Sequence, residues 1–221
     1  MDILKRHELF EIEALERLKS GKFLEPLVFG GGTMLRLCYE LNRYSADLDF
    51  WFIKNIRPAA YFKRLRQFLD GQYELTDAQA KFYTLLFEIR SREYPKRLKI
   101  EIRRGVKKCD MQERIAFSKS GTQQVILKVH TPEQTMRNKI EAATERKEIR
   151  DCFDIEFLLR MGIPLLASPA RLVRLKEVVL SFKKDDFSVT LGSLLEPDIR
   201  KYYIENRFSF LLEKLSLVQS K

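Results

Sequence analysis

Two aspartates two positions apart are the residues of this chain whose spacing most clearly suggests chemistry. Asp47 and Asp49 flank Leu48 in an apolar segment, and in a β-strand both carboxylates would point to the same face. Two like charges held so close repel each other strongly unless a cation lies between them. The pair therefore indicates a metal site. The alternative is an ordinary half-exposed strand with polar residues on its solvent side.

A glycine-rich turn comes shortly before the aspartates. Gly31, Gly32 and Thr33 follow a short apolar strand and open a helical segment, an abrupt change of direction that glycine tolerates. Backbone N–H groups at such a turn form an anion site suited to a triphosphate, and the Thr33 hydroxyl is free to cap the helix or bind a phosphate. Glycines also close ordinary turns. Combined with an Asp pair for one or two Mg²⁺ ions, the turn predicts nucleotidyl transfer.

These residues carry a resemblance to a known family. Gly31-Gly32-Thr33 followed by Arg43-x-Ser45-x-Asp47-Leu48-Asp49-Phe50 resembles the GGT and RxSxDLDF signature of the AbiEii-type nucleotidyltransferases, toxin components of abortive-infection and related toxin–antitoxin systems in the polymerase-β-like superfamily. The resemblance implies catalytic and metal-binding roles for the aspartates, and nucleotide binding by the glycine turn, Arg43 and Ser45. Members often carry a lysine just before the two glycines, where this chain has Gly30.

The superfamily pattern also implies a third carboxylate on a later, adjacent strand. Glu101 alternates with the apolar residues Ile100 and Ile102, so it is the first candidate for the metal site. Glu88 is the competing candidate. Either is also consistent with an ordinary residue on the solvent face of a strand.

A second resemblance lies downstream, in the segment NKIEAATERKEIRDCFDIEFLL. Its Lys139, Arg146, Arg150, Asp151 and Asp154 resemble the helical K…R…RDxxD motif of the family. The resemblance implies that Lys139 and Asp151 are catalytic and that the other three bind the nucleotide. On one unbroken helix most of these residues would form a polar stripe, for which a solvated, salt-bridged helix face is the alternative.

The elements needed to position these residues can be read from the apolar periodicity. Helices are predicted at 3–19, 33–39 and 58–69, and strands at 27–29, 48–53, 73–75, 82–89, 98–103 and 125–129. Thr131-Pro132 starts a helical pattern that continues to Met161. Strands without intervening helices predict an α/β (α+β) fold with a nucleotidyltransferase-like mixed sheet flanked by helices. We expect an α/β domain at 1–130 and a helical domain at 131–221 that completes the active site.

Composition limits the partners. The 221 residues carry a formal charge of +10, which favours a polyanionic partner such as RNA. The N-terminus has no signal-peptide pattern and no apolar run is long enough for a membrane span, so we expect a cytoplasmic protein without a membrane partner. Three scattered cysteines and two histidines make a zinc site unfavourable.

One aromatic cluster near the C-terminus has two interpretations. Tyr202, Tyr203, Phe208 and Phe210 lie beside basic residues, a mixture that can stack on an RNA strand. Aromatic residues at helical spacing are more often part of a core, and we expect core packing here.

The combined hypothesis is a Mg²⁺-dependent nucleotidyltransferase that moves a nucleoside monophosphate from an NTP to an acceptor hydroxyl. An RNA such as tRNA is the expected acceptor. The family resemblance implies a toxin restrained by a cognate antitoxin protein. The alternative hypothesis is a non-catalytic RNA- or protein-binding module built on the same scaffold.

Overall fold

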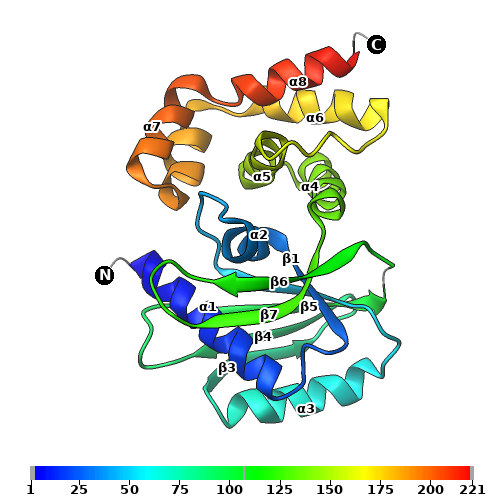
Figure 1. The fold of residues 1–221 in the computed structure, drawn as a ribbon, viewed down its shortest axis with the longest axis vertical. Coiled ribbons are helices and arrows are strands. Elements are labelled where there is room, and N and C mark those ends of the chain that lie inside the picture. Colours follow the sequence, from blue (N-terminus) through cyan, green and yellow to red (C-terminus); the bar gives the residue numbers. More distant parts are fainter. Residues whose placement is uncertain (1–2, 107, 220–221) are drawn as a thin grey trace. The chain divides into compact units, whose positions relative to one another are not determined.

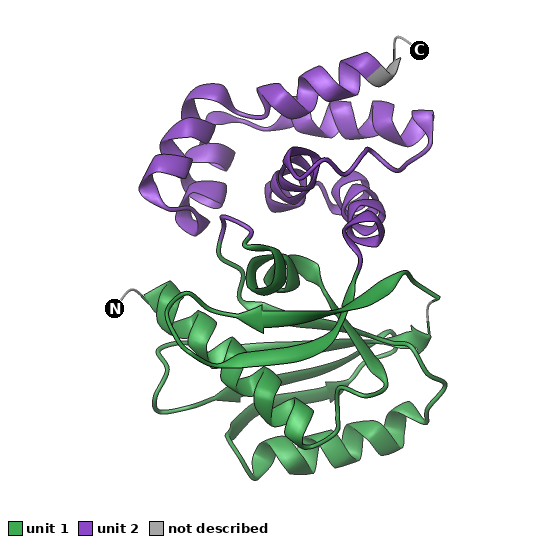
Figure 2. Ribbon diagram, in the orientation of Figure 1, with its two compact units in different colours: residues 1–40, 44–130 green, residues 41–43, 131–221 purple. Residues whose placement is uncertain are grey.

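The computed structural model describes residues 3–106 and 108–219, and the chain divides into two compact units. Unit 1 comprises residues 1–40 and 44–130, and unit 2 comprises residues 41–43 and 131–221 (Figure 2). The sequence places a division after residue 130 but gives no sign that residues 41–43 belong with the second unit. Within the described ranges, no helix has the length and apolar character needed to cross a membrane.

Unit 1 is built on one seven-stranded mixed sheet, which confirms the predicted fold class (Figure 1). The strands are β1 (Leu27–Gly30), β2 (Asp47–Phe52), β3 (Glu74–Ala80), β4 (Thr84–Arg90), β5 (Leu98–Val106), β6 (Met111–Phe117) and β7 (Gln124–His130). Their order across the sheet is β3-β4-β5-β2-β1-β7-β6. The β1–β7 and β2–β5 pairs are parallel, and the other neighbouring pairs are antiparallel.

Strand β2 is the central strand of the sheet, and its side chains alternate between a buried face and a half-buried face. Leu48, Phe50 and Phe52 are buried, whereas Asp47 and Asp49 on the opposite face are half-buried. The Phe50 ring packs 5.1 Å from that of Phe29 on β1, and each such buried side chain contributes about 1.5–3 kcal/mol. The apolar face therefore fixes the direction in which both carboxylates point.

Three helices belong to unit 1: α1 (Ile3–Ser20), α2 (Gly31–Tyr39) and α3 (Pro58–Asp70). Figure 1 shows α1 running across the strands and α3 beside β3 and β4. Helix α3 begins at a proline in its first turn, where the missing N–H costs nothing, and Tyr61 packs edge-to-face on Phe52 at 5.1 Å. These contacts cover the apolar face of β2.

Strand β6 is absent from the sequence prediction. It lies at one edge of the sheet, and most of its side chains are exposed or half-buried. An edge strand of this kind keeps charged residues such as Glu113 and Arg114, because only one neighbour, β7, has to be paired. Its apolar alternation is correspondingly too weak to be recognised in the sequence.

Unit 2 is helical, as predicted. Its elements are α4 (Pro132–Arg146), α5 (Ile149–Arg160), α6 (Pro169–Ser181), a π-helical turn η1 (Asp186–Leu191), a 3₁₀ turn η2 (Gly192–Leu194), α7 (Pro197–Asn206) and α8 (Ser209–Gln219). The hydroxyl oxygen of Thr131 accepts from the backbone N–H of Gln134 at 3.2 Å, which confirms the predicted start of α4.

The prediction of one continuous helix through residue 148 is wrong. Helix α4 ends at Lys147, which has a left-handed backbone (φ 55°) and donates its N–H to Ala143 O at 3.1 Å. Helix α5 begins two residues later and packs against α4. A left-handed residue after a helix closes its last turn and reverses the chain. The single polar stripe therefore does not exist, and its residues meet across two helices.

The C-terminal aromatic cluster is core only in part: Tyr202 is exposed and Phe210 is half-buried. Tyr203 and Phe208 are buried, and their rings lie 5.6 Å apart. The buried carboxylate of Glu156 accepts from the Tyr203 hydroxyl at 3.0 Å and from the Leu211 N–H at 3.2 Å. This one side chain ties α5 to α7 and α8.

Candidate active site

The glycine turn is shaped around an aspartate. Gly31 has φ 77°, a conformation that favours glycine, and a Cβ atom built on it would collide with the Asp49 carboxylate. Gly30 is paired with Asp49 on the neighbouring strand. Close approach of the turn to Asp49 thus requires glycine at position 31.

Gly30 is constrained by two aromatic rings. A Cβ atom at this position would lie 2.6 Å from Trp51 Cζ3 and 2.6 Å from His130 Nδ1. The two rings pack with centroids 4.8 Å apart. Any side chain at position 30 would have to displace this pair, so here the turn is formed without the lysine that family members often carry.

Thr33 holds the aspartate strand in place. Its side chain is buried, and its hydroxyl donates to the backbone carbonyl of Asp47 at 2.6 Å. The N-cap of α2 is Gly30, with no side-chain cap. The Thr33 hydroxyl therefore binds the β2 backbone and positions Asp47. It does not cap α2.

Register brings a third carboxylate beside the aspartate pair. Asp49 on β2 is directly paired with Glu101 on the parallel strand β5. Asp47 is paired with Lys99, so the three carboxylates lie on the same face of two adjacent strands. This is the arrangement that the alternation of β5 predicts for Glu101.

Lys99 neutralises part of this cluster. Its ammonium forms an ion pair with Glu101. Burial alone would lower the pKa of Lys99, but the hydrogen bond to Glu101 and the charges of Asp47 and Asp49 raise it. No group of three or more His, Cys, Asp or Glu side chains among the described residues is gathered around a cation-sized space. In this arrangement the Lys99 ammonium offsets part of the repulsion between the carboxylates.

Glu88 is engaged elsewhere. Its carboxylate accepts from the Thr76 hydroxyl at 2.7 Å and from Arg97 at 2.8 Å, and these bonds lower its pKa. On the sheet it is paired with Lys99, one strand farther from Asp47 than Glu101 is. Register therefore favours Glu101 over Glu88.

Two buried groups behind Asp47 are missing from the sequence prediction. Glu11 is fully buried, and within the described residues neither of its carboxylate oxygens accepts a hydrogen bond; His7 Nε2 lies 3.6 Å from Oε1. Burial raises its pKa well above the ordinary value, and the Glu8 and Asp47 charges raise it further. One turn earlier, His7 Nε2 lies 3.1 Å from Ala46 O. The only sequence signal is a pair of polar residues at positions where the α1 pattern requires core.

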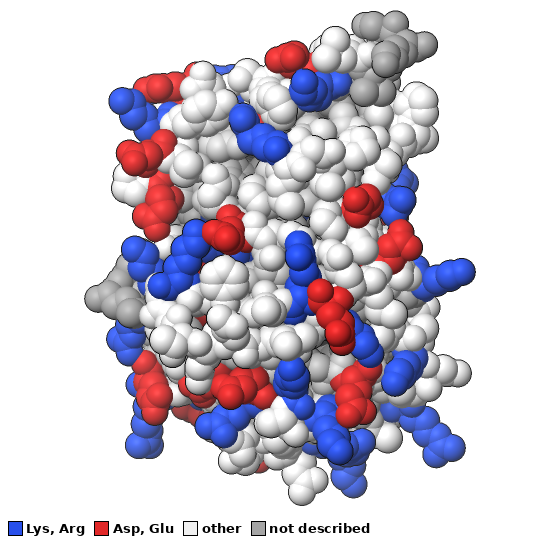
Figure 3. All heavy atoms as spheres, in the orientation of Figure 1, with Lys and Arg blue, Asp and Glu red and all other residues white. Residues whose placement is uncertain are grey.

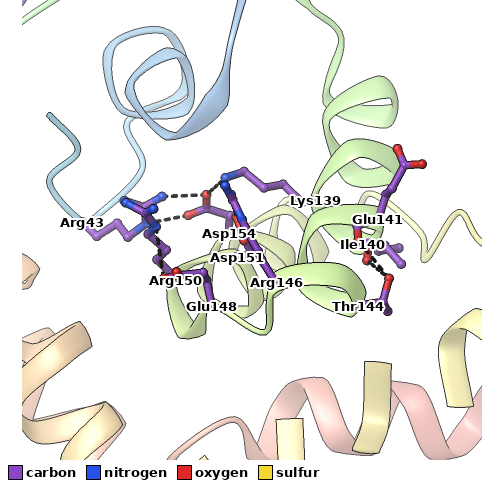
Figure 4. A network of polar contacts seen from close by, with 10 residues as sticks. All are labelled: Arg43, Lys139, Ile140, Glu141, Thr144, Arg146, Glu148, Arg150, Asp151 and Asp154. Carbon is purple, nitrogen blue, oxygen red and sulfur yellow. Dashed lines mark hydrogen bonds and ion pairs between the residues drawn. The ribbon is translucent and has the colours of Figure 1, made fainter. Parts of the chain in front are cut away.

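The second predicted motif forms a buried ionic cluster in unit 2 (Figure 4). The Lys139 ammonium lies 3.0 Å from Asp151 Oδ1 and 2.6 Å from Asp154 Oδ2. Arg146 binds Asp151 through two hydrogen bonds of 2.7 and 2.8 Å, and Arg43 binds Asp154 through two of 2.7 Å. Three cations thus face two carboxylates, a net charge of +1.

Both aspartates of this cluster are buried against cations. Asp151 and Asp154 have no exposed surface, and α5 turns them inward onto Lys139. Burial alone would raise the pKa of Asp151, but the Lys139 ammonium and the Arg146 guanidinium outweigh it and lower this pKa to about 2. The side chain of Arg146 is 46% exposed, so it is the member that reaches solvent.

The three remaining predicted residues, Arg43, Arg150 and Ser45, differ in burial and in their partners. Arg43 is buried with its guanidinium on Asp154, so it holds the unit 2 cluster together. Arg150 pairs with the exposed Glu148 at 3.7 Å rather than with the two aspartates. Ser45 is half-buried two residues before Asp47.

The mixed sheet with its strand-turn-helix is the nucleotidyltransferase fold, and a family match gives the class of protein. The family model described as "Nucleotidyl transferase AbiEii toxin, Type IV TA system" matches residues 13–219, and the chain belongs to this family. Toxin–antitoxin membership implies an antitoxin partner and a nucleotide substrate. A comparison with curated proteins finds no match.

Solved structures share the fold at low sequence identity. A Helicobacter pylori protein named provisionally as a nucleotidyltransferase is 20% identical with a TM-score of 0.57, covering 95% of this chain and 96% of its own. JHP933 from Helicobacter pylori is 20% identical with a TM-score of 0.56, and the match covers 96% of this chain and 94% of JHP933. An antigenic nucleotidyltransferase-like protein from Paracoccidioides brasiliensis is 18% identical with a TM-score of 0.51 over 88% and 95%.

Proposed function

We propose that the protein transfers a nucleoside monophosphate from an NTP to an RNA hydroxyl, and that Mg²⁺ is required. The observation that carries the proposal is the register that sets Asp47, Asp49 and Glu101 on one face beside a glycine turn. The acceptor oxygen bonds to the α-phosphorus, the bond to the β-phosphate oxygen breaks, pyrophosphate leaves and the hydroxyl proton is released to water.

The carboxylates fit a divalent cation by their chemistry. Hard oxygen donors are the ligands that Mg²⁺ prefers, and Asp47, Asp49 and Glu101 are the side chains that would hold it. Bound there, the ion would neutralise phosphate charge and lower the pKa of the acceptor hydroxyl. Lys99 would have to release Glu101 for this, because its ammonium now occupies that carboxylate.

The glycine turn suits the leaving phosphates. Gly31 and Gly32 begin α2, whose first turn carries no acidic residue and no side-chain cap, a helix start that favours an anion. Ser45 lies close in sequence on the approach to β2. The Thr33 hydroxyl contributes indirectly, by fixing the Asp47 backbone.

For unit 2 we propose that Arg146 and Lys139 bind phosphate groups. The cluster carries one more cation than carboxylates, and Asp151 keeps both of these side chains in place. Asp154 pairs with Lys139 and is itself paired with Arg43, so these two residues hold Lys139 in place. Arg150, exposed beside Glu148, supplies further positive charge at the surface.

An RNA acceptor such as tRNA is consistent with the net charge of +10. The cytoplasmic setting that we propose rests on the toxin–antitoxin family. The cognate antitoxin would restrain this transfer.

Transfer of label from α-³²P-NTP to total RNA tests the proposal. Asp47→Asn and Asp49→Asn are expected to lose at least about 100-fold in rate, because the charge that holds the cation is removed. Asp77→Asn is the matched control, an aspartate on β3 of the same sheet that accepts from Gln79, and should keep wild-type activity. Undiminished labelling by both site variants would refute the proposal. Tight RNA binding indifferent to NTP and to both variants would instead support a non-catalytic binding module.

A further inference from the structure

The turn between β3 and β4 exposes two aromatic rings. Among the described residues, Phe82 and Tyr83 have the most exposed aromatic side chains, at 78% and 74%. Their rings meet edge-to-face with centroids 4.6 Å apart, so each keeps most of its surface in water. Leaving such a ring in solvent forgoes about 1.5–3 kcal/mol of burial, and contiguous exposed apolar surface marks an interaction site.

This aromatic tip, defined as residues 81–83, is fixed by hydrogen bonds. Arg104 on β5 donates to the carbonyls of Lys81 at 2.8 Å and Phe82 at 3.3 Å, and its backbone N–H donates to Tyr83 O at 2.9 Å. Lys81 N–H donates to Thr84 O at 2.8 Å. A tip held from both sides loses little conformational freedom when a ligand binds.

The surroundings of the tip are cationic. Lys81 belongs to it, and Arg103 is exposed on β5 in register with Thr84, the residue after the tip. A cavity of about 440 Å³ in the same unit has a largely apolar lining whose charged members are four cations and one carboxylate: Lys22, Lys54, Arg57, Arg64 and Glu25. Figure 3 shows Lys and Arg side chains crowding the lower right of the molecule, within unit 1.

The tip lies beyond the carboxylates along the direction of β5. Glu101, in register with Asp49, is two residues before Arg103, and Lys99, in register with Asp47, is four residues before it. At about 3.3 Å per residue these steps are roughly 7 and 13 Å along the strands. A strand of several nucleotides bound at the tip can therefore extend towards the candidate catalytic groups.

We propose that the aromatic tip is a stacking platform for unpaired RNA nucleotides, with Lys81 and Arg103 contacting the flanking phosphates. Every base offers a π-face to a ring, and every nucleotide brings a phosphate to a cation, which matches two open rings flanked by basic side chains. The identity of this RNA as the acceptor strand rests on the proposed function. The platform itself does not.

Fluorescence anisotropy with a labelled oligouridylate of about ten nucleotides tests the platform, without NTP or divalent cation. Wild-type protein should bind it, and Phe82→Ala/Tyr83→Ala should bind at least about tenfold more weakly, since stacking contributes about 1–3 kcal/mol per base. Ile126→Ala, which removes a side chain 51% exposed on β7 of the same unit, is the matched control and should bind like wild type. Because the rings are exposed, the double variant should keep the wild-type Tm.

Two further variants separate stacking from charge. Phe82→Trp/Tyr83→Trp should keep the wild-type affinity, because the rings are retained. Arg103→Gln should reduce the slope of log K against log salt concentration by roughly 0.7, the value for one phosphate contact on a single strand.

Equal affinity of the wild type and the double alanine variant would overturn the platform, as would absence of oligouridylate binding by the wild type. A protein partner that the double variant loses while its RNA affinity is unchanged would overturn it too. These outcomes are independent of the proposed activity, which Asp47→Asn tests by label transfer. RNA binding by Asp47→Asn with wild-type affinity and no transfer would support both proposals separately.

Discussion

The two groups of charged residues differ in how their charges are compensated. In unit 1, the half-buried carboxylates Asp47, Asp49 and Glu101 share one nearby lysine, Lys99. In unit 2, every oxygen of two fully buried aspartates is bonded to a lysine or an arginine. The first group has an excess of negative charge open to water, and the second has an excess of one positive charge.

The difference separates carboxylates that can accept a cation from carboxylates that are tied to the fold. A buried charge is tolerated only when it is paired, so the unit 2 aspartates are tied to the fold. Half-exposed carboxylates carry like charges on one face, where water screens part of the repulsion and a cation can reach them. The same residue type is therefore expected to respond oppositely to mutation in the two units.

The largest expected effect is on the buried group. Asp154→Ala would remove the buried carboxylate that Arg43 and Lys139 share, leaving Lys139 with Asp151 alone, and should cost about 3–5 kcal/mol of unfolding free energy. Urea denaturation of the full chain measures it. Arg150→Ala, at an exposed pair, should change stability by less than about 1 kcal/mol. Asp49→Asn should leave stability unchanged or raise it, and equal destabilisation by Asp154→Ala and Asp49→Asn would contradict the contrast.

Acid should weaken the buried group selectively. The pKa of Asp151 is lowered from 3.8 to about 2 in the folded protein. A lowered carboxyl pKa stabilises the protein above pH 3.8, and that contribution, about 2 kcal/mol, is lost as pH falls towards 2. The stability difference between wild type and Asp151→Asn should therefore shrink between about pH 4 and pH 2. A difference that stays constant over this window would show that Asp151 is not held by Lys139 and Arg146.

Removing Lys99 should strengthen Mg²⁺ binding by the unit 1 carboxylates. Lys99→Met takes away the ammonium that occupies Glu101, so Mg²⁺ should bind up to about fivefold more tightly. Titration calorimetry with MgCl₂ measures this. Lys119→Met, which removes the exposed partner of Glu40, is the matched control and should leave the Mg²⁺ affinity unchanged. Weaker Mg²⁺ binding by Lys99→Met would mean that Lys99 supports the site.

The smallest effect is expected at Glu11, a buried carboxyl with a raised pKa whose oxygens accept no hydrogen bond in the described part of the chain, with His7 Nε2 3.6 Å from Oε1. A raised pKa favours the protonated folded state, so stability falls as pH rises above 4.5. Glu11→Gln removes this cost and should raise the Tm at pH 8 by about 2–4 °C, the shift for about 1 kcal/mol, with little change at pH 4.5. Scanning calorimetry at the two pH values measures it. An identical shift at both would exclude ionisation as the cause.

The parts of the site that depend on local pattern could be predicted. Alternation with Leu48 and Ile100 fixes the faces of the carboxylates, and the glycines mark the turn. Long-range partners could not be predicted: Arg43 and Asp154 are 111 residues apart, and no periodicity links them. The break at Lys147 also escapes prediction, because lysine gives no local signal for a left-handed backbone. Lys99 reads as an ordinary solvent-face residue until the register of β2 and β5 is known.

The assignment of residues 41–43 to unit 2 determines how the protein can be dissected. The backbone passes through unit 2 at residues 41–43, continues in unit 1 from residue 44, and enters unit 2 again after residue 130. A fragment ending at His130 would keep Arg43 and lose Asp154, while the complementary fragment would have a buried aspartate without its arginine. Neither half is a self-sufficient product of one cut. Fragment complementation, in which both halves are synthesised together, is the arrangement in which this ion pair can form again.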